Sequence, residues 1–107
     1  MTFGKIIART RKEAGLNQKQ LAALIKKEDG YPISTPYLND IEHDRRSPSS
    51  DHIIDQFSRA LKIEPEILYF IAKRIPPSAY KTPADEKLMV AALRALHRVL
   101  QRGAVTP

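Results

Sequence analysis

Apolar residues recur along this chain at helical spacing, and proline or glycine falls between the segments that they mark. In the first segment Ile6 and Ile7 are apolar, Thr2 is placed to cap a helix, and Gly15 stands where a left-handed residue commonly ends one. No stretch sustains the alternation of apolar and polar residues that a half-buried strand requires. The pattern therefore predicts an all-α protein.

The second segment opens with a capping-box pattern, in which the Asn17 side chain accepts from an early backbone N–H and Gln20 reaches back. Three apolar residues then follow at positions i, i+3 and i+4 from Leu21, which predicts a helix over about 18–26. The next stretch, 26–33, is polar and contains one glycine and one proline, so it is predicted to be a loop.

The third helix begins after Ser34 or Thr35, since either hydroxyl can cap it, and Pro36 fits the first turn because no intrahelical hydrogen bond is lost there. Its apolar side is narrow and consists mainly of Leu38 and Ile41. The residues that must point elsewhere are Thr35, Pro36, Asn39 and Asp40. A helix that packs by one stripe and offers small polar groups on the other side suits the DNA major groove, which admits one helix.

Two more helices complete the first part of the chain. Apolar residues mark a fourth helix over 53–61, and Pro65 opens a fifth helix whose apolar positions continue to Ile75. The prolines that follow begin a connector over 76–82, because paired prolines do not continue a helix.

A C-terminal helix is predicted over 83–102, with Thr82 as its cap and Gly103 at its end. Its apolar seam recurs at spacings of three and four and consists of Leu88, Met89, Ala92, Leu93, Leu96, Val99 and Leu100. The seam either docks on the body formed by residues 1–75 or pairs with the same helix of a second chain. We favour pairing, because the connector lets the helix reach a neighbour.

Composition narrows the classes of function. The 107 residues carry 18 Lys or Arg and 12 Asp or Glu, a formal net charge of +6, which favours an anionic partner but is common in soluble proteins. There is no cysteine, the three histidines lie on separate elements, and no glycine-rich phosphate loop or paired nucleophile and base occurs. We therefore expect no metal, no cofactor and no enzyme activity. No apolar run approaches the roughly 20 residues that cross a bilayer, so we expect a cytoplasmic, nucleoid-associated protein without a membrane partner.

Three stretches taken together resemble a known family. They run Gly15-Leu16-Asn17-Gln18-Lys19-Gln20-Leu21-Ala22, then Ile33-Ser34 through Tyr37-Leu38-Asn39-Asp40-Ile41-Glu42, then Arg46-Ser47-Pro48. Residues 3–75 are similar to the Cro/repressor-type helix-turn-helix family of bacterial and phage regulators. The resemblance implies a five-helix domain that binds double-stranded DNA, with residues 34–42 as the recognition helix.

The resemblance also implies roles for individual residues. Base edges would be read by Thr35, Pro36, Asn39 and Asp40. Phosphates would be bound by Gln18, Arg45 and Arg46, to which we add their neighbours Asn17, Lys19 and Tyr37. Arg11 and Glu42 match a buried ion pair between the first and third helices. Three alternatives stay open: Asp40 bonds the basic turn instead, Asn39 is an ordinary exposed residue, and Tyr37 packs with its hydroxyl at the surface.

The chain departs from the family pattern at two places, which limits the roles that the resemblance implies there. The loop 26–33 is about eight residues long where three or four are usual, which the fold should tolerate because loop lengthening is thermodynamically cheap. Pro36 has no side-chain donor and offers only apolar contact.

The expected function is a sequence-specific DNA-binding transcriptional regulator, a repressor, that reads a palindromic operator as a homodimer. The rival is an antitoxin that sequesters a toxin partner and regulates its own gene, and a third reading is a nonspecific nucleoid protein.

Overall fold

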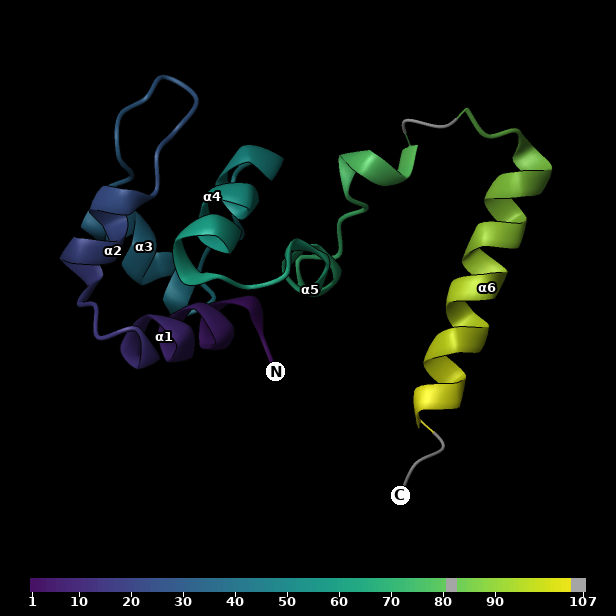
Figure 1. Ribbon diagram of the computed structural model, residues 1–107, viewed down its shortest axis with the longest axis horizontal. Coiled ribbons are helices and arrows are strands. Elements are labelled where there is room, and N and C mark those ends of the chain that lie inside the picture. Colours follow the sequence, from purple (N-terminus) through teal and green to yellow (C-terminus); the bar gives the residue numbers. More distant parts are fainter. Residues whose placement is uncertain (81–82, 105–107) are drawn as a thin grey trace. The chain divides into compact units, whose positions relative to one another are not determined.

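The computed structural model describes residues 1–80 and 83–104, which form six α-helices, one short 3-10 helix and no strand (Figure 1). The helices are α1 (Phe3–Glu13), α2 (Gln18–Leu24), α3 (Thr35–Glu42), α4 (Asp51–Leu61), α5 (Pro65–Ile71), the 3-10 helix Pro77–Tyr80 and α6 (Glu86–Ala104). The chain divides into two units, Met1–Pro76 and Pro77–Pro107. The prediction of an all-α fold with an additional C-terminal helix is confirmed.

The caps of the first three helices follow from side-chain chemistry. The Thr2 hydroxyl accepts from the backbone N–H of Lys5 at 3.1 Å, and Asn17 and Gln20 form both halves of the capping box that the sequence predicts. Ser34 settles the choice left open for α3, because its hydroxyl accepts from the backbone N–H of Tyr37 at 3.1 Å.

The predicted ends of the second and fifth helices were wrong. The second helix stops at Leu24, because Ile25 turns to extended backbone and its carbonyl accepts from the N–H of Ile33. The fifth helix stops at Ile71 rather than Ile75, two residues before a left-handed backbone conformation at position 73.

The C-terminal helix begins later than predicted, at Glu86 instead of residue 83, and it continues through Gly103 to Ala104 instead of ending at residue 102. The Asp85 carboxylate accepts from the backbone N–H of Leu88 at 2.8 Å and so acts as its cap. The predicted cap, Thr82, lies outside the described residues. The connector predicted over 76–82 contains the 3-10 helix, which starts at the second of its two prolines.

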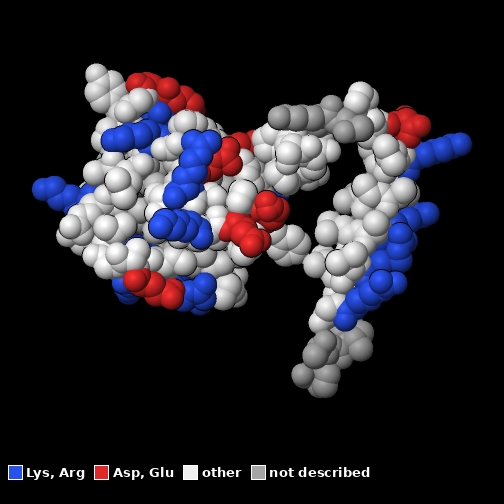
Figure 2. Space-filling model, in the orientation of Figure 1, with Lys and Arg blue, Asp and Glu red and all other residues white. Residues whose placement is uncertain are grey.

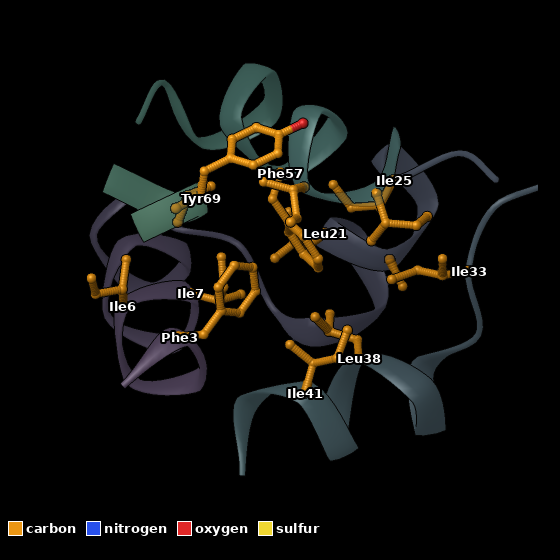
Figure 3. Close-up of a cluster of buried hydrophobic side chains, with 14 residues drawn as sticks. Phe3, Ile6, Ile7, Leu21, Ile25, Ile33, Leu38, Ile41, Phe57 and Tyr69 are labelled. Carbon is orange, nitrogen blue, oxygen red and sulfur yellow. The ribbon is translucent and has the colours of Figure 1, made fainter. Parts of the chain in front are cut away.

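One core fills the first unit and draws on all five of its helices (Figure 3). Phe57 of α4 is fully buried, and the edge of its ring meets Phe3 of α1 with 6.0 Å between ring centroids. The other buried apolar side chains are Ile6, Ile7, Leu21, Ala22, Ile25, Ile33, Leu38, Ile41, Ile53, Ile54, Leu68 and Tyr69. Because Leu38 and Ile41 are among them, the core fixes which side of α3 remains at the surface.

The start of α1 packs closely against the end of α3. The Asp44 carboxylate accepts from the backbone N–H of Gly4 at 2.9 Å and from the Thr2 hydroxyl at 2.6 Å. A Cβ atom at Gly4 would overlap the carbonyl oxygens of Ile41 and Glu42, the latter at 2.6 Å. Glycine is therefore required at position 4 for this approach of two backbones.

Replacing Gly4 with alanine is expected to lower the free energy of unfolding by about 1–3 kcal/mol, because backbone atoms must move apart to admit the methyl group. Urea unfolding followed by circular dichroism measures the change. Gly103→Ala is the matched control, since nothing lies within 4 Å of that position, and it should leave unfolding of the first unit unchanged. Equal midpoints for wild type and Gly4→Ala would contradict the close approach.

Candidate nucleic-acid interface

Helix α3 presents one buried and one accessible side. Leu38 and Ile41 are fully buried, and Glu42 is 8% exposed. On the other side Pro36 is exposed, and Thr35, Asn39 and Asp40 are half-buried. All four residues predicted to read bases therefore keep access to solvent.

The long loop between α2 and α3 is a structured excursion (Figure 1). An isolated antiparallel bridge joins Lys26 to Pro32, and the turn at its tip contains Gly30 with a φ of 87°. Only a loop is predicted for 26–33 from its polar residues, although Asp29-Gly30 is a dipeptide typical of tight hairpin turns. That dipeptide is a signal for the turn at Gly30, but it does not identify Lys26 and Pro32 as the bridge partners.

Helix α4 holds this loop in place. The backbone N–H of Lys26 donates to Gln56 Oε1 at 3.0 Å, and the Lys26 carbonyl lies 2.9 Å from His52 Nε2. The Ser50 hydroxyl donates to Glu28 at 3.2 Å. Within the described residues, none of the loop's hydrogen bonds involves the four residues on the accessible side of α3. The loop is thus tied to α4.

The turn after α3 is basic and is organised by Asp40. The Asp40 carboxylate accepts from Arg45 Nε at 3.1 Å and lies 3.8 Å from Arg46 Nε. The backbone carbonyl of Asp40 accepts from the backbone N–H groups of Arg45 and Arg46. The Arg46 guanidinium lies 5.8 Å from the centroid of the Tyr37 ring, a cation–π distance. Both arginine side chains are more than half exposed, so the turn presents two cations at the surface. Figure 2 shows several Lys and Arg side chains at the surface of the first unit.

Tyr37 connects α3 to the segment before α4. Its hydroxyl accepts from the backbone N–H of Ser49 at 3.0 Å. Tyr37 was predicted either to pack or to bind phosphate, and its bond with Ser49 was not predicted, because the sequence holds no clear signal for it. Asp44, the anchor for α1, was also missed. Its left-handed φ of 58° is a conformation that Asp tolerates better than most residues.

A buried network joins α1, α2 and α3. Arg11 Nε donates to Glu42 Oε2 at 2.6 Å, and Arg11 Nη2 donates to Glu42 Oε1 at 3.0 Å. A third nitrogen of Arg11 donates to the carbonyl of Leu16 at 2.9 Å. Gln18 Nε2 donates to Glu42 Oε1 at 3.0 Å and to Asn39 Oδ1 at 3.1 Å. The network therefore runs from a buried guanidinium to a side chain on the accessible side of α3.

This network changes what the first residues of α2 can offer to a ligand. Both amide hydrogens of Gln18 are donated within the protein, so its side chain has no donor left for a phosphate. The side-chain oxygen of Asn17 is engaged in the capping box at 2.7 Å from the N–H of Gln20. Lys19 is exposed.

The second unit carries an amphipathic helix. The predicted seam residues of α6 are accessible, with Leu88, Met89, Leu93, Leu96, Val99 and Leu100 between 45% and 64% exposed and Ala92 exposed as well. Lys87, Arg94 and Arg98 recur at spacings of seven and four and lie on one side of the helix together with Val90 and Ala91. Figure 2 shows Lys and Arg side chains gathered along the second unit's helix. Within its own unit, the apolar side of α6 is therefore uncovered.

The described residues contain neither a membrane-spanning helix nor a metal-binding cluster. No helix in the described part of the chain is both long and apolar enough to cross a bilayer. Among residues 1–80 and 83–104, His, Asp and Glu side chains form no group of three that could hold a metal ion.

The arrangement of α1 to α5, with a capped α2 and a half-accessible α3, is that of a helix-turn-helix domain. A family model described as Helix-turn-helix matches residues 7–68, more than half of the chain. The chain belongs to the Cro/repressor-type helix-turn-helix family. In this helix-turn-helix domain α2 and α3 are the motif helices, and the resemblance inferred from sequence is confirmed.

Two curated relatives agree with this assignment. They are named as uncharacterised HTH-type transcriptional regulators of Mycobacterium tuberculosis, from strain CDC 1551 / Oshkosh and from strain ATCC 25618 / H37Rv. Each is 35% identical over 75 residues, which is 70% of this chain and 49% of the relative. The chain therefore spans about half the length of these relatives. No solved structure gives a significant match.

Proposed function

We propose that this helix-turn-helix protein is a sequence-specific DNA-binding transcriptional regulator that acts as a repressor. The observation that carries the proposal is the accessible polar side of α3, which adjoins a turn with two exposed arginines. A helix of this kind fits the major groove, where base edges are distinguishable by their donors and acceptors. Exposed arginines beside it are suited to phosphates, which provide affinity and fix the register.

The residues divide by the chemistry that they offer. Thr35 and Pro36, at the start of α3, present a hydroxyl and an apolar ring to base edges, and Asn39 presents an amide one turn later. Arg45 and Arg46 reach phosphates, as does Lys19. The Asp40 carboxylate contacts Arg45 and Arg46. These contacts favour a role for Asp40 in holding the basic turn rather than in direct reading of cytosine.

Homodimerisation through α6 completes the proposal. Its apolar residues at 89, 92, 96 and 99 repeat at alternating spacings of three and four, the pattern by which helices pair. Two copies related by a two-fold axis would match a palindromic operator, whose half-sites lie about 34 Å apart or a multiple of that distance. A toxin bound to the same face is the competing occupant, and native mass spectrometry of the complex purified from its host distinguishes the two by mass.

Selection of bound fragments from a random DNA pool tests the proposal. We expect an enriched motif with two inverted half-sites, centred about 10 base pairs apart or a multiple of that spacing. Binding without any enriched motif at physiological salt would indicate a nonspecific nucleoid protein instead.

The Arg46→Ala variant is expected to weaken binding to all DNA sequences alike and to reduce the salt dependence of binding. Loss of one phosphate contact lowers the slope of log K against log salt by about 0.9 per protomer. Fluorescence anisotropy across a salt series measures the slope. Arg59→Ala, which removes an exposed arginine at the far end of α4, is the control and should keep the wild-type slope. An unchanged slope for Arg46→Ala would remove the basic turn from the interface.

A further inference from the structure

The network that begins at Arg11 ends at Asn39, one of the residues proposed to read bases. Asparagine is unusual among such residues because its side chain carries a donor on one atom and an acceptor on the other. A free asparagine can use both to pair with adenine, donating to N7 and accepting from the N6 amine. Which of the two atoms is available therefore decides which base the residue prefers.

The orientation of Gln18 is fixed from the buried side. The Glu42 carboxylate is paired with Arg11 and offers only acceptors. The Gln18 atom that lies 3.0 Å from Glu42 Oε1 must be the nitrogen, because an oxygen there would place two acceptors against each other. One hydrogen of that nitrogen goes to Glu42, so the second is aimed at Asn39.

The orientation of Asn39 follows from that of Gln18. The Asn39 atom 3.1 Å from Gln18 Nε2 must be the acceptor Oδ1. The Nδ2 group of Asn39 makes no hydrogen bond to any other described residue, and the side chain is half-buried on the accessible side of α3. The bond from Gln18 takes one of the two lone pairs of Asn39 Oδ1 and holds that oxygen toward α2, so the side chain presents its Nδ2 group to a ligand.

We propose that Asn39 is a specificity-determining residue that donates from its Nδ2 group to guanine instead of forming the two-bond pair with adenine, because Gln18 holds its Oδ1 toward α2. Guanine is the one base whose major-groove edge presents two acceptors, O6 and N7, and no donor. Cytosine, which presents its N4 amine, is disfavoured most. The inference rests on the proposed DNA-binding function and specifies one part of it: Gln18 on α2 sets the base preference of a residue on α3.

The experiment begins by locating the base pair that Asn39 reads. Motifs are selected from a random DNA pool with the full-length wild type and with the Asn39→Ala variant. We expect guanine to be enriched about tenfold over the other bases at one position of each half-site. In Asn39→Ala that preference should flatten, while the other positions of the motif stay as in wild type.

The Gln18→Ala variant then tests the cause. Without the Gln18 amide, Asn39 Oδ1 is no longer held toward α2 and can turn to accept from the adenine N6 amine, so the preference at the same position should move from guanine to adenine. Lys19→Ala, the adjacent exposed residue on α2, is the matched control and should weaken binding without changing any base preference. Thermal unfolding of each variant confirms that it is folded, and Gln18→Ala should remain so because Glu42 keeps its pairing with Arg11.

The outcomes separate this inference from the function on which it rests. An enriched motif with adenine at the Asn39-dependent position of the wild type overturns the inference and leaves the DNA-binding proposal intact. If Asn39→Ala selects the same motif as the wild type, the inference is likewise overturned and the DNA-binding proposal stays intact. Absence of any enriched motif removes the proposed function and the inference with it. Guanine in the wild type together with adenine in Gln18→Ala supports the inference.

Discussion

The Arg11→Met variant is expected to unfold with a free energy about 3–5 kcal/mol lower than wild type. The substitution leaves the Glu42 carboxylate in a site where its side chain is only 3% exposed, without the guanidinium that binds both of its oxygens. The donor that satisfies the Leu16 carbonyl is lost as well. Urea unfolding by circular dichroism gives the difference.

Two variants separate a buried charge from a general effect of losing arginine. Arg9→Met removes the partner of Glu13 from an ion pair whose side chains are 56% and 66% exposed, so a loss below about 1 kcal/mol is expected. The double variant Arg11→Met with Glu42→Met removes both charges and should recover much of the loss. If Arg11→Met were no worse than Arg9→Met, the pair would contribute little to stability.

Local sequence signals predict the elements of the first unit because each helix start depends on a few neighbouring residues. The capping box of Asn17 and Gln20 and the cap at Thr2 are self-contained, since donor and acceptor lie three residues apart. The ends of helices were less predictable. Apolar spacing continues from Ile71 to Ile75, yet the helix ends at Ile71, because periodicity records which residues are apolar and not where the backbone turns.

Contacts between distant segments could not be read from the chain. Asp44 lies in a turn and gives no sign that its carboxylate binds the start of α1, about 40 residues away. Gly4 falls early in the first predicted helix, where glycine is unfavourable by propensity alone. Only the fold shows that the end of α3 comes so close that a side chain there is excluded.

The candidate site shows the same division between identity and orientation. The residue types of the exposed side of α3 follow from its narrow apolar stripe, and family resemblance adds the pairing of Arg11 with Glu42. Which end of the Asn39 amide faces a base depends on the hydrogen bond from Gln18, a residue 21 positions away in the sequence. Hydrogen-bond direction of this kind is a property of the assembled network, so a motif alone does not determine which base an asparagine reads.

The largest effect on DNA binding is expected from the apolar face of α6. In the Leu96→Glu variant a carboxylate replaces a side chain in the middle of the proposed dimer interface, and burying it against a second helix is strongly unfavourable. The protein should become monomeric, and apparent affinity for a two-half-site operator should fall about 100-fold or more, because the second domain no longer binds at high effective concentration. Light scattering and anisotropy titration measure the two changes.

The Ala91→Glu variant is the matched control, since residue 91 lies on the same side of α6 as Lys87 and Arg94. It should remain dimeric. Affinity of both proteins for a single half-site should be similar, because the core that positions α3 lies between Phe3 and Tyr69 and does not involve α6. A Leu96→Glu protein that is still dimeric would place the interface elsewhere. A monomeric wild type that gains mass only with a second, smaller protein from its host would assign the face of α6 to a toxin.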